Sequence, residues 1–370
     1  MIARLRRLVT EWTTLVPLLA TVLLVLTWGR GLPGAVVVVV TLVLAGAVLA
    51  AVHHAEVVAH RVGEPFGSLV LAVAVTVIEV ALIVTLMIDG GDKSASLARD
   101  TVFAAVMITC NGILGLSLLV GSLRHGTAVF NSEGAGAALA TVATLATLSL
   151  VLPTFTTSKP GPEFSTVQLT FAAVSSLILY GLFVATQTVR HRDYFLPVPR
   201  QGEAATGGKH TEEHAEAPST RTALISLGLL GLALIGVVGL AKGVSPTIES
   251  AVETAGLPHA VVGVIIALLV LLPETIAAVR AARRDQVQIS MNLALGSAMA
   301  SIGLTIPAVA LASLWLPGPL VLGLGNTHMV LLALTVVVSA LTVAPGRATP
   351  LQGGVHLVLL AAYLELAINP

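Results

Sequence analysis

Eleven long apolar runs, each bounded by charged residues, glycine or proline, constrain the fold of this chain more than any other feature. They lie at about 12–29, 34–59, 66–88, 101–121, 134–152, 166–188, 222–241, 258–279, 290–316, 327–344 and 351–368. A helix that crosses the hydrocarbon core of a membrane needs about 20 apolar residues. The runs are rich in Leu, Ala and Val and lack the alternating polarity of barrel strands. The sequence therefore predicts an all-α polytopic membrane protein with about eleven transmembrane helices.

Composition supports the same class. Of the 370 residues, 56% are hydrophobic and 10% are charged, whereas soluble domains carry about 25% charged residues. A water-soluble globule and a disordered chain are both excluded, because the first needs more polar surface and the second far fewer apolar residues. The formal net charge of zero argues against nucleic acid as a partner.

The placement of Lys and Arg predicts an orientation in the membrane. If the N-terminus is cytoplasmic and each run crosses once, most of the 19 basic residues fall on the cytoplasmic side. The outer side then holds only Arg30, Lys93, Arg99, Lys159 and Lys242. This bias agrees with the positive-inside rule. We expect a multi-pass protein of a bacterial inner (plasma) membrane, with an uncleaved first span, a cytoplasmic N-terminus and an external C-terminus.

The two halves of the chain share a pattern. Glu-x6-Gly-x-Pro occurs at 56–65 and again at 249–258, and each copy leads into an apolar run with one central acid, Glu79 or Glu274. By the charge assignment the two acid-bearing helices run in opposite directions. Inverted repeats are typical of secondary transporters, whose binding sites lie near the bilayer midplane between the repeats.

This comparison predicts four parts. Residues 1–33 form an extra N-terminal transmembrane helix, and 34–190 and 222–370 form two five-helix repeats. A hydrophilic segment, 191–221, joins the repeats on the cytoplasmic side. It contains His210, Glu212, Glu213, His214 and Glu216 among Gly, Ala and Pro, a composition that favours a solvated linker over a metal-binding tract.

Glu79 and Glu274 are the strongest candidate functional residues. An ionised carboxylate at membrane depth costs at least a few kcal/mol and needs a partner, a hydrated cavity or a proton. No Lys or Arg lies deep in any predicted span, so an ion pair does not explain the two acids. Two facing carboxylates repel each other, and burial disfavours charge. We therefore expect them to hold protons until a cation displaces them.

Further oxygen ligands are expected nearby, because hard cations such as Ca²⁺ take several oxygens from carboxylates, carbonyls and amides. Thr76, Asn111 and Ser297 are the candidate side chains. The backbone carbonyl of Leu269 is a further candidate, since Pro273 has no N–H to pair with it.

Polar residues near span ends suggest routes for ions. Glu56 and His60 lie four residues apart, hence on one helix face, and Glu249 and Glu253 are the corresponding pair in the second half. We expect these four residues to form proton or cation access routes; an interfacial polar cap is the alternative for the first pair. The zinc protease pattern is His-Glu-x-x-His, whereas the order at 54–60 is His-Ala-Glu-Val-Val-Ala-His, so the spacing does not match an intramembrane zinc enzyme.

Several motifs resemble a known family. The segment from Gly63 to Glu79 resembles the first repeat of ChaA-type calcium/proton antiporters, in the calcium/cation antiporter superfamily. Leu272-Pro-Glu-Thr, Asn292-Leu-Ala-Leu-Gly-Ser and Ser301-Ile-Gly-Leu-Thr-Ile-Pro resemble the second repeat. In outline the resemblance covers nearly the whole chain.

The resemblance implies exchange of cytoplasmic Ca²⁺, and in some members Na⁺ or K⁺, for protons. It implies that Glu79 and Glu274 are the paired glutamates of the site, with Asn111 and Ser297 beside them. The chain departs from relatives that carry Pro or Asn beside the first glutamate, where it has Val77 and Ile78.

The interpretation of the whole sequence is a cation/proton antiporter that works by alternating access. The proton gradient would supply the energy, and no cofactor or nucleotide is expected because no Gly-x4-Gly-Lys-Ser/Thr loop occurs. The expected partners are cations, protons and the lipid bilayer. The alternatives are a proton-independent cation channel and, with less support, an intramembrane metal-dependent enzyme.

Overall fold

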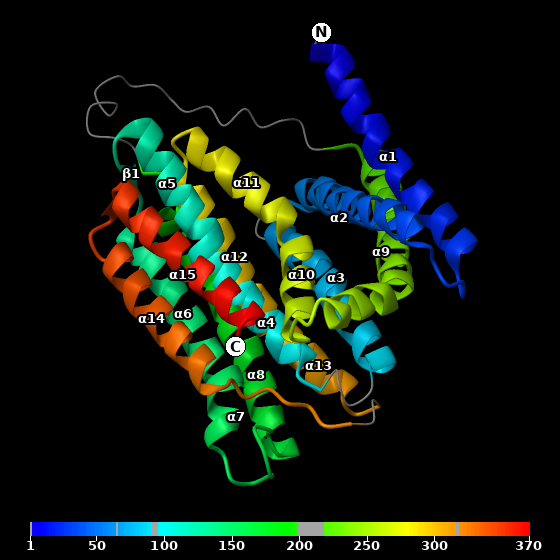
Figure 1. Cartoon of the computed structure of the whole chain (residues 1–370). Helices are drawn as coiled ribbons and strands as arrows, with labels where there is room; N and C mark the ends of the chain where they lie inside the picture. Colours follow the sequence, from blue (N-terminus) through cyan, green and yellow to red (C-terminus); the bar gives the residue numbers. More distant parts are fainter. Residues whose placement is uncertain (1, 64–65, 91–94, 199–217, 316–317) are drawn as a thin grey trace.

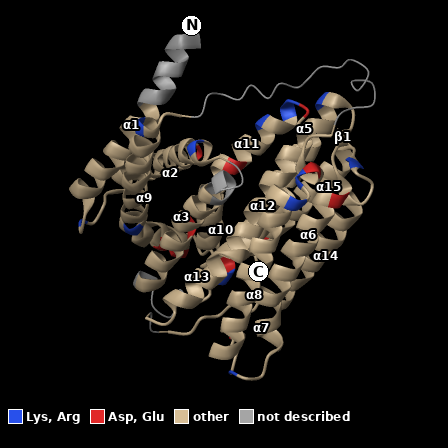
Figure 2. Ribbon diagram, turned by 180° about the vertical axis from the view of Figure 1, so that it is seen from behind, with Lys and Arg blue, Asp and Glu red and all other residues tan. Residues whose placement is uncertain are grey.

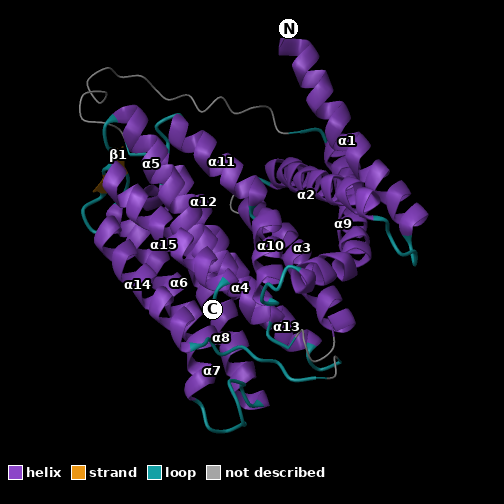
Figure 3. Ribbon diagram, in the orientation of Figure 1, coloured by secondary structure: helices purple, strands orange, loops and turns teal. Residues whose placement is uncertain are grey.

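The computed structural model describes residues 2–63, 66–90, 95–198, 218–315 and 318–370, and this part of the chain is almost entirely helical (Figures 1 and 3). The first half contains α1 (Ile2–Thr27), α2 (Gly34–Val62), α3 (Phe66–Gly90), α4 (Leu97–Met107), η2 (Ile108–Ile113), α5 (Leu114–His125), α6 (Ser132–Ala146), η3 (Thr147–Val151), α7 (Leu152–Phe155), α8 (Thr166–Ala185), η4 (Thr186–Arg190) and η5 (Arg192–Phe195). The second half contains α9 (Thr220–Thr254), α10 (Ala260–Val270), α11 (Leu272–Arg283), α12 (Val287–Gly303), α13 (Thr305–Ala312), α14 (Asn326–Val343) and α15 (Pro350–Ile368). The short strands β1 (Ala128–Val129) and β2 (Arg347–Ala348) pair antiparallel. The predicted all-α polytopic fold is confirmed.

Eight of the described helices, some of them continued through a π-helical turn, are long and apolar enough to cross a membrane. A ninth span forms if α10 and α11 are taken together, and two shorter apolar helices lie at Trp12–Thr27 and Ala72–Ile88. The predicted number of eleven is reached only if both of these cross as well, so the number stays a prediction. The division into four parts also stays a prediction, and most of the linker, including His210 to Glu216, lies outside the described residues.

One run predicted as a single continuous helix is bent at a break. The run at 258–279 divides into α10 and α11, which bend by 52° at Leu271. Pro273 lies in the first turn of α11, where its missing N–H costs nothing. The run at 290–316 contains α12 and α13, which are separated only at Leu304 and together form one span, Val287–Ala312. Hydropathy alone did not reveal the bend at Leu271, since apolar residues continue through it.

Two large hydrophobic clusters form the interior. One is built mainly from α4, η2, α5, α6, α12, α14 and α15, and the other mainly from α1, α2 and α9. Helices α3 and α10 contribute buried residues to both clusters: Ile83 and Ala267 to the first, Ile78 and Ile266 to the second. Figure 1 shows the second group of helices beside the first, with α3 and α10 between them. The two helices therefore lie where the clusters meet.

Several Lys and Arg positions gather at one end of the molecule (Figure 2). This end holds the C-termini of α5 and α11 and the β1–β2 pair, with Arg124, Arg280, Arg283, Arg284 and Arg347 all exposed. We call it the basic end. Lys159 lies on the loop at the opposite end, between α7 and α8.

Candidate cation-binding site

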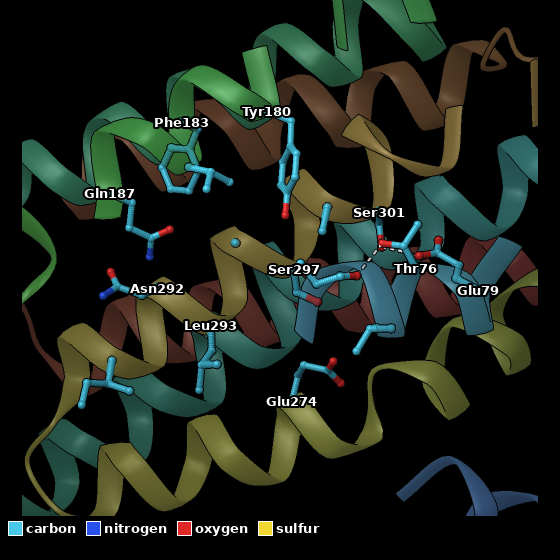
Figure 4. Close-up of a pocket in the computed structure, with 16 residues that line it drawn as sticks. Thr76, Glu79, Tyr180, Phe183, Gln187, Glu274, Asn292, Leu293, Ser297 and Ser301 are labelled. Carbon is cyan, nitrogen blue, oxygen red and sulfur yellow. Dashed lines mark hydrogen bonds between the residues drawn. The ribbon is translucent and has the colours of Figure 1, made fainter. Parts of the chain in front are cut away.

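A cavity of about 230 Å³ lies between α3, α8, α11 and α12 (Figure 4). It is lined by Ala72, Val75, Thr76, Glu79, Tyr180, Phe183, Val184, Gln187, Glu274, Ile289, Asn292, Leu293, Gly296, Ser297, Ala300 and Ser301. One water molecule needs only about 10–15 Å³ of such space, so several waters or a partly hydrated ion fit. The two predicted glutamates, one from each half of the chain, thus share one cavity.

Glu79 is held in the middle of α3 and is only 3% exposed. Its Oε2 accepts a hydrogen bond of 2.9 Å from the Ser301 hydroxyl on α12. Its Oε1 is buried and has no hydrogen-bond partner among the described residues. A buried oxygen without a partner costs about 1–3 kcal/mol, more if charged. A ligand that contacts Oε1 would remove that cost.

Glu274 enters the cavity from the first turn of α11, directly after the bend at Leu271. Its Oε2 is also buried and, within the described part of the chain, without a partner. The free N–H groups at the beginning of a helix favour a negative charge, so the bend supports a carboxylate at this position. Glu79 and Glu274 together present two unpaired carboxylate oxygens.

The lining contains oxygen atoms that can bind a cation, and it contains no basic group. Besides the glutamates it includes the hydroxyls of Thr76, Tyr180, Ser297 and Ser301 and two carboxamides, but no Lys, Arg, His or Cys. Thr76 Oγ1 donates to the Ala72 carbonyl at 2.8 Å, which leaves its lone pairs free to accept. In addition, no group of three or more His, Cys, Asp or Glu residues suited to a metal occurs among the described residues. Polar side chains that offer oxygen ligands, without thiolate or imidazole, suit hard cations and protons.

Asn111 lies elsewhere. It is fully buried in the π-helical turn η2, where its Nδ2 donates to Thr335 Oγ1 at 2.9 Å and its Oδ1 contacts His356 Nδ1 at 3.1 Å. His356 Nε2 is in turn 3.2 Å from Thr342 Oγ1. These contacts link η2 to α14 and α15. The structure does not bring Asn111 to the cavity, and its predicted role as an ion ligand stays a prediction.

Leu269 is also absent from the lining; its side chain packs against the cluster that contains α2 and α9.

The two residue pairs predicted as access routes lie in different parts of the molecule. Glu56, on α2, lies within electrostatic reach of Glu274 and Arg280, and His60 follows one turn later. Glu249 and Glu253 lie near the end of α9, where Glu249 accepts a 2.8 Å hydrogen bond from Ser245. None of the four lines the cavity.

Helix α8 and its continuation η4 form a wall that sequence analysis missed. Tyr180, Phe183 and Gln187 line the cavity from this wall. Their spacing of three and four residues puts them on one helix face, but this run contains no acid that would have drawn attention to it. Tyr180 fits because Gly303 has no side chain: a Cβ at Gly303 would lie 2.9 Å from Tyr180 Cβ.

The chain is similar in sequence to known proteins. The sodium/calcium exchanger protein family matches residues 32–189 and 225–369. The chain is 47% identical to the "Putative ionic transporter y4hA" of Sinorhizobium fredii, over 97% of this chain and 96% of that one. It is 35% identical to the "Sodium-potassium/proton antiporter ChaA" of Escherichia coli, over 96% and 95%.

A solved structure agrees in fold. The Ca²⁺/H⁺ antiporter YfkE superimposes with a TM-score of 0.67 at 16% identity, covering 97% of this chain and 99% of that chain. The family match extends over most of the chain, on both sides of the linker. The chain therefore belongs to the sodium/calcium exchanger protein family and is a multi-pass membrane transporter rather than an enzyme.

Proposed function

We propose that this protein exports a cytoplasmic metal cation in exchange for protons, with Ca²⁺ as the main cation and Na⁺ or K⁺ as further substrates. The single observation that carries the proposal is that Glu79 and Glu274, from the two halves of the chain, line one cavity with unpaired carboxylate oxygens. The relatives support the chemistry, since their names describe a sodium-potassium/proton antiporter and a Ca²⁺/H⁺ antiporter.

In the proposed cycle, Glu79 and Glu274 hold either protons or the cation, with Ser297 and Thr76 as additional oxygen ligands. An empty site with two charged carboxylates is costly to enclose, because burying charge without compensation costs several kcal/mol per ion. The site therefore changes its access from one side of the membrane to the other only when it holds protons or a cation. This requirement couples the two ions without any cofactor or nucleotide.

Access from either side would require the two repeats to move against each other. The position of the cavity between α3, α8, α11 and α12 suits this motion, since α3 belongs to the first predicted repeat and α11 and α12 to the second. Ions would approach from the basic end past Glu56, which lies near Glu274. From the other side they would approach past the Glu249–Glu253 pair. We assign the basic end to the cytoplasm and propose a cytoplasmic N-terminus and an external C-terminus.

Everted membrane vesicles test the proposal. A proton gradient is imposed across the vesicle membrane, and Ca²⁺, Na⁺ and K⁺ are added in turn while the internal pH is followed. We expect at least one cation to dissipate the gradient in vesicles with the protein, and none in vesicles with the double variant Glu79→Gln, Glu274→Gln. Cation flux that proceeds at the same rate without proton movement would instead indicate a channel and refute the proposal.

A further inference from the structure

The α8 wall carries a polar side chain at the end of the cavity that the two glutamates do not occupy. Gln187 lies in the π-helical turn η4, two residues after α8 ends. Figure 4 shows its carboxamide and that of Asn292 on α12 pointing toward each other at one end of the cavity, away from Glu79. π-Helical turns within longer helices are often found at functional sites.

The two carboxamides differ in how they are bound. Asn292 is fixed: its Oδ1 accepts from Gln288 Nε2 at 2.8 Å, and its Nδ2 donates to the Phe195 carbonyl at 2.6 Å. Gln288 Oε1 accepts in turn from the Asn131 N–H at 2.7 Å. This chain of hydrogen bonds holds the beginning of α6, α12 and η5 together. No hydrogen bond of the Gln187 carboxamide occurs within the described residues, although Gln187 is half-buried.

The positions of residues along α12 give the distance between the two carboxamides and the level of Glu79. Asn292 and Ser301 both line the cavity, and Ser301 contacts Glu79. Nine residues of α-helix correspond to about 13 Å at 1.5 Å per residue. The two carboxamides thus lie about 13 Å from the level of Glu79. Asn292 lies near the beginning of α12, which follows the end of α11, and neighbouring Gln288 accepts from Asn131 beside β1. This end of the cavity therefore lies toward the basic end.

We propose that Gln187 is the first protein ligand of a cation that enters from this end of the cavity: its amide oxygen replaces water of hydration before the cation reaches Glu79 and Glu274. A cation leaving water needs oxygens at each stage, because desolvation without compensation is costly. A neutral amide oxygen contributes part of that compensation and releases the ion easily. This inference rests on the proposed exchange function and adds a residue that governs affinity from one side.

The test uses transport with a defined orientation. The variant Gln187→Leu removes the oxygen and keeps a similar length, Gln187→Glu keeps an oxygen, and Thr188→Val is the matched control. Thr188 lies in the same π-helical turn, donates to the Val184 carbonyl at 2.7 Å and does not line the cavity. Initial rates are measured against Ca²⁺ concentration in everted and in right-side-out vesicles.

For Gln187→Leu we expect about a tenfold rise in the half-saturating Ca²⁺ concentration at the basic-end face, the effect of one lost contact to a cation. The maximal rate should stay within about twofold, and the opposite face should be unchanged. Gln187→Glu should restore affinity to within about threefold, and Thr188→Val should behave as the unmodified protein.

Three results would overturn the inference. Unchanged half-saturation at both faces in Gln187→Leu would show that the amide does not contact the ion. A lower maximal rate with unchanged half-saturation would show a structural role only. Absence of proton-coupled exchange in the unmodified protein would refute the proposed function itself, and this outcome is distinguishable because it does not depend on any variant.

Discussion

Filling the cavity without disturbing the fold is the most direct test of where ions pass. Gly296 on α12 lines the cavity, and a Cβ added there would meet no atom within 4 Å. Gly181 on α8 is exposed on the outer surface and also has no atom within 4 Å of an added Cβ. A side chain at either position therefore begins in free space. At Gly296 that space is the cavity, and at Gly181 it is the surface that faces lipid.

The two variants should agree in stability and differ in transport. Replacing glycine in a helix interior by leucine favours the helix by slightly less than the about 0.8–1 kcal/mol that separates glycine from alanine, so neither Gly296→Leu nor Gly181→Leu should unfold the protein. An apolar side chain in the cavity removes at least one polar contact of the ion, a loss of about 1.5–3 kcal/mol. That loss corresponds to about a 10- to 150-fold reduction of transport at subsaturating cation. Gly296→Ala, which adds one methyl group, should have a smaller effect.

The assay pairs a melting curve with the rate at which added cation dissipates a proton gradient in everted vesicles. We expect both leucine variants to melt at or above the temperature of the unmodified protein, and only Gly296→Leu to lose exchange. Exchange in Gly296→Leu within twofold of the unmodified rate would refute the assignment of this cavity to the ion path. An equal loss in Gly181→Leu would attribute the effect to the membrane-facing surface instead.

Three further predictions concern other contacts. Gly353→Ala should destabilise the protein by about 1–3 kcal/mol, because its Cβ would lie 2.6 Å from the Leu119 backbone nitrogen; Gly354→Ala, with no atom within 4 Å, should melt unchanged. Asn111→Ala should lower the melting temperature, because its contacts to two other helices are lost, while cation affinity changes less than about twofold. A tenfold weaker affinity without destabilisation would contradict this and favour a ligand role. Ser301→Ala should raise the half-saturating cation concentration about tenfold, because the hydrogen bond that orients the acid on α3 is lost; unchanged affinity would show that this bond is dispensable.

The sequence predicted the helices better than their breaks. Hydropathy located the helices because the length of an apolar run directly reflects the thickness of the membrane. The internal repeat predicted that Glu79 and Glu274 share one site, because each acid follows the same local motif. The bend at Leu271 was not predicted, because it interrupts no apolar run.

At the site, the predictions from sequence failed for a similar reason, namely irregular helix geometry and the absence of a charged residue. Thr76 and Ser297 reach the cavity as predicted for residues near the two acids, whereas Asn111 does not. The π-helical turn η2 changes which face Asn111 occupies, and the 3.6-residue period assumed for a regular helix gives no warning of it. The α8 wall went unnoticed because its polar groups, Tyr180 and Gln187, are uncharged and carry no energetic signal in the sequence comparable to a buried acid.

The two separate hydrophobic clusters have a consequence for how this protein can vary. The cavity lies beside α3, which contributes to both clusters, and apart from Tyr180 its polar side chains belong to neither cluster. Changes within one cluster should alter resistance to heat, and changes in the lining should alter ion preference or turnover. Selection can therefore adjust durability and ion choice through different sets of positions, with little conflict between the two.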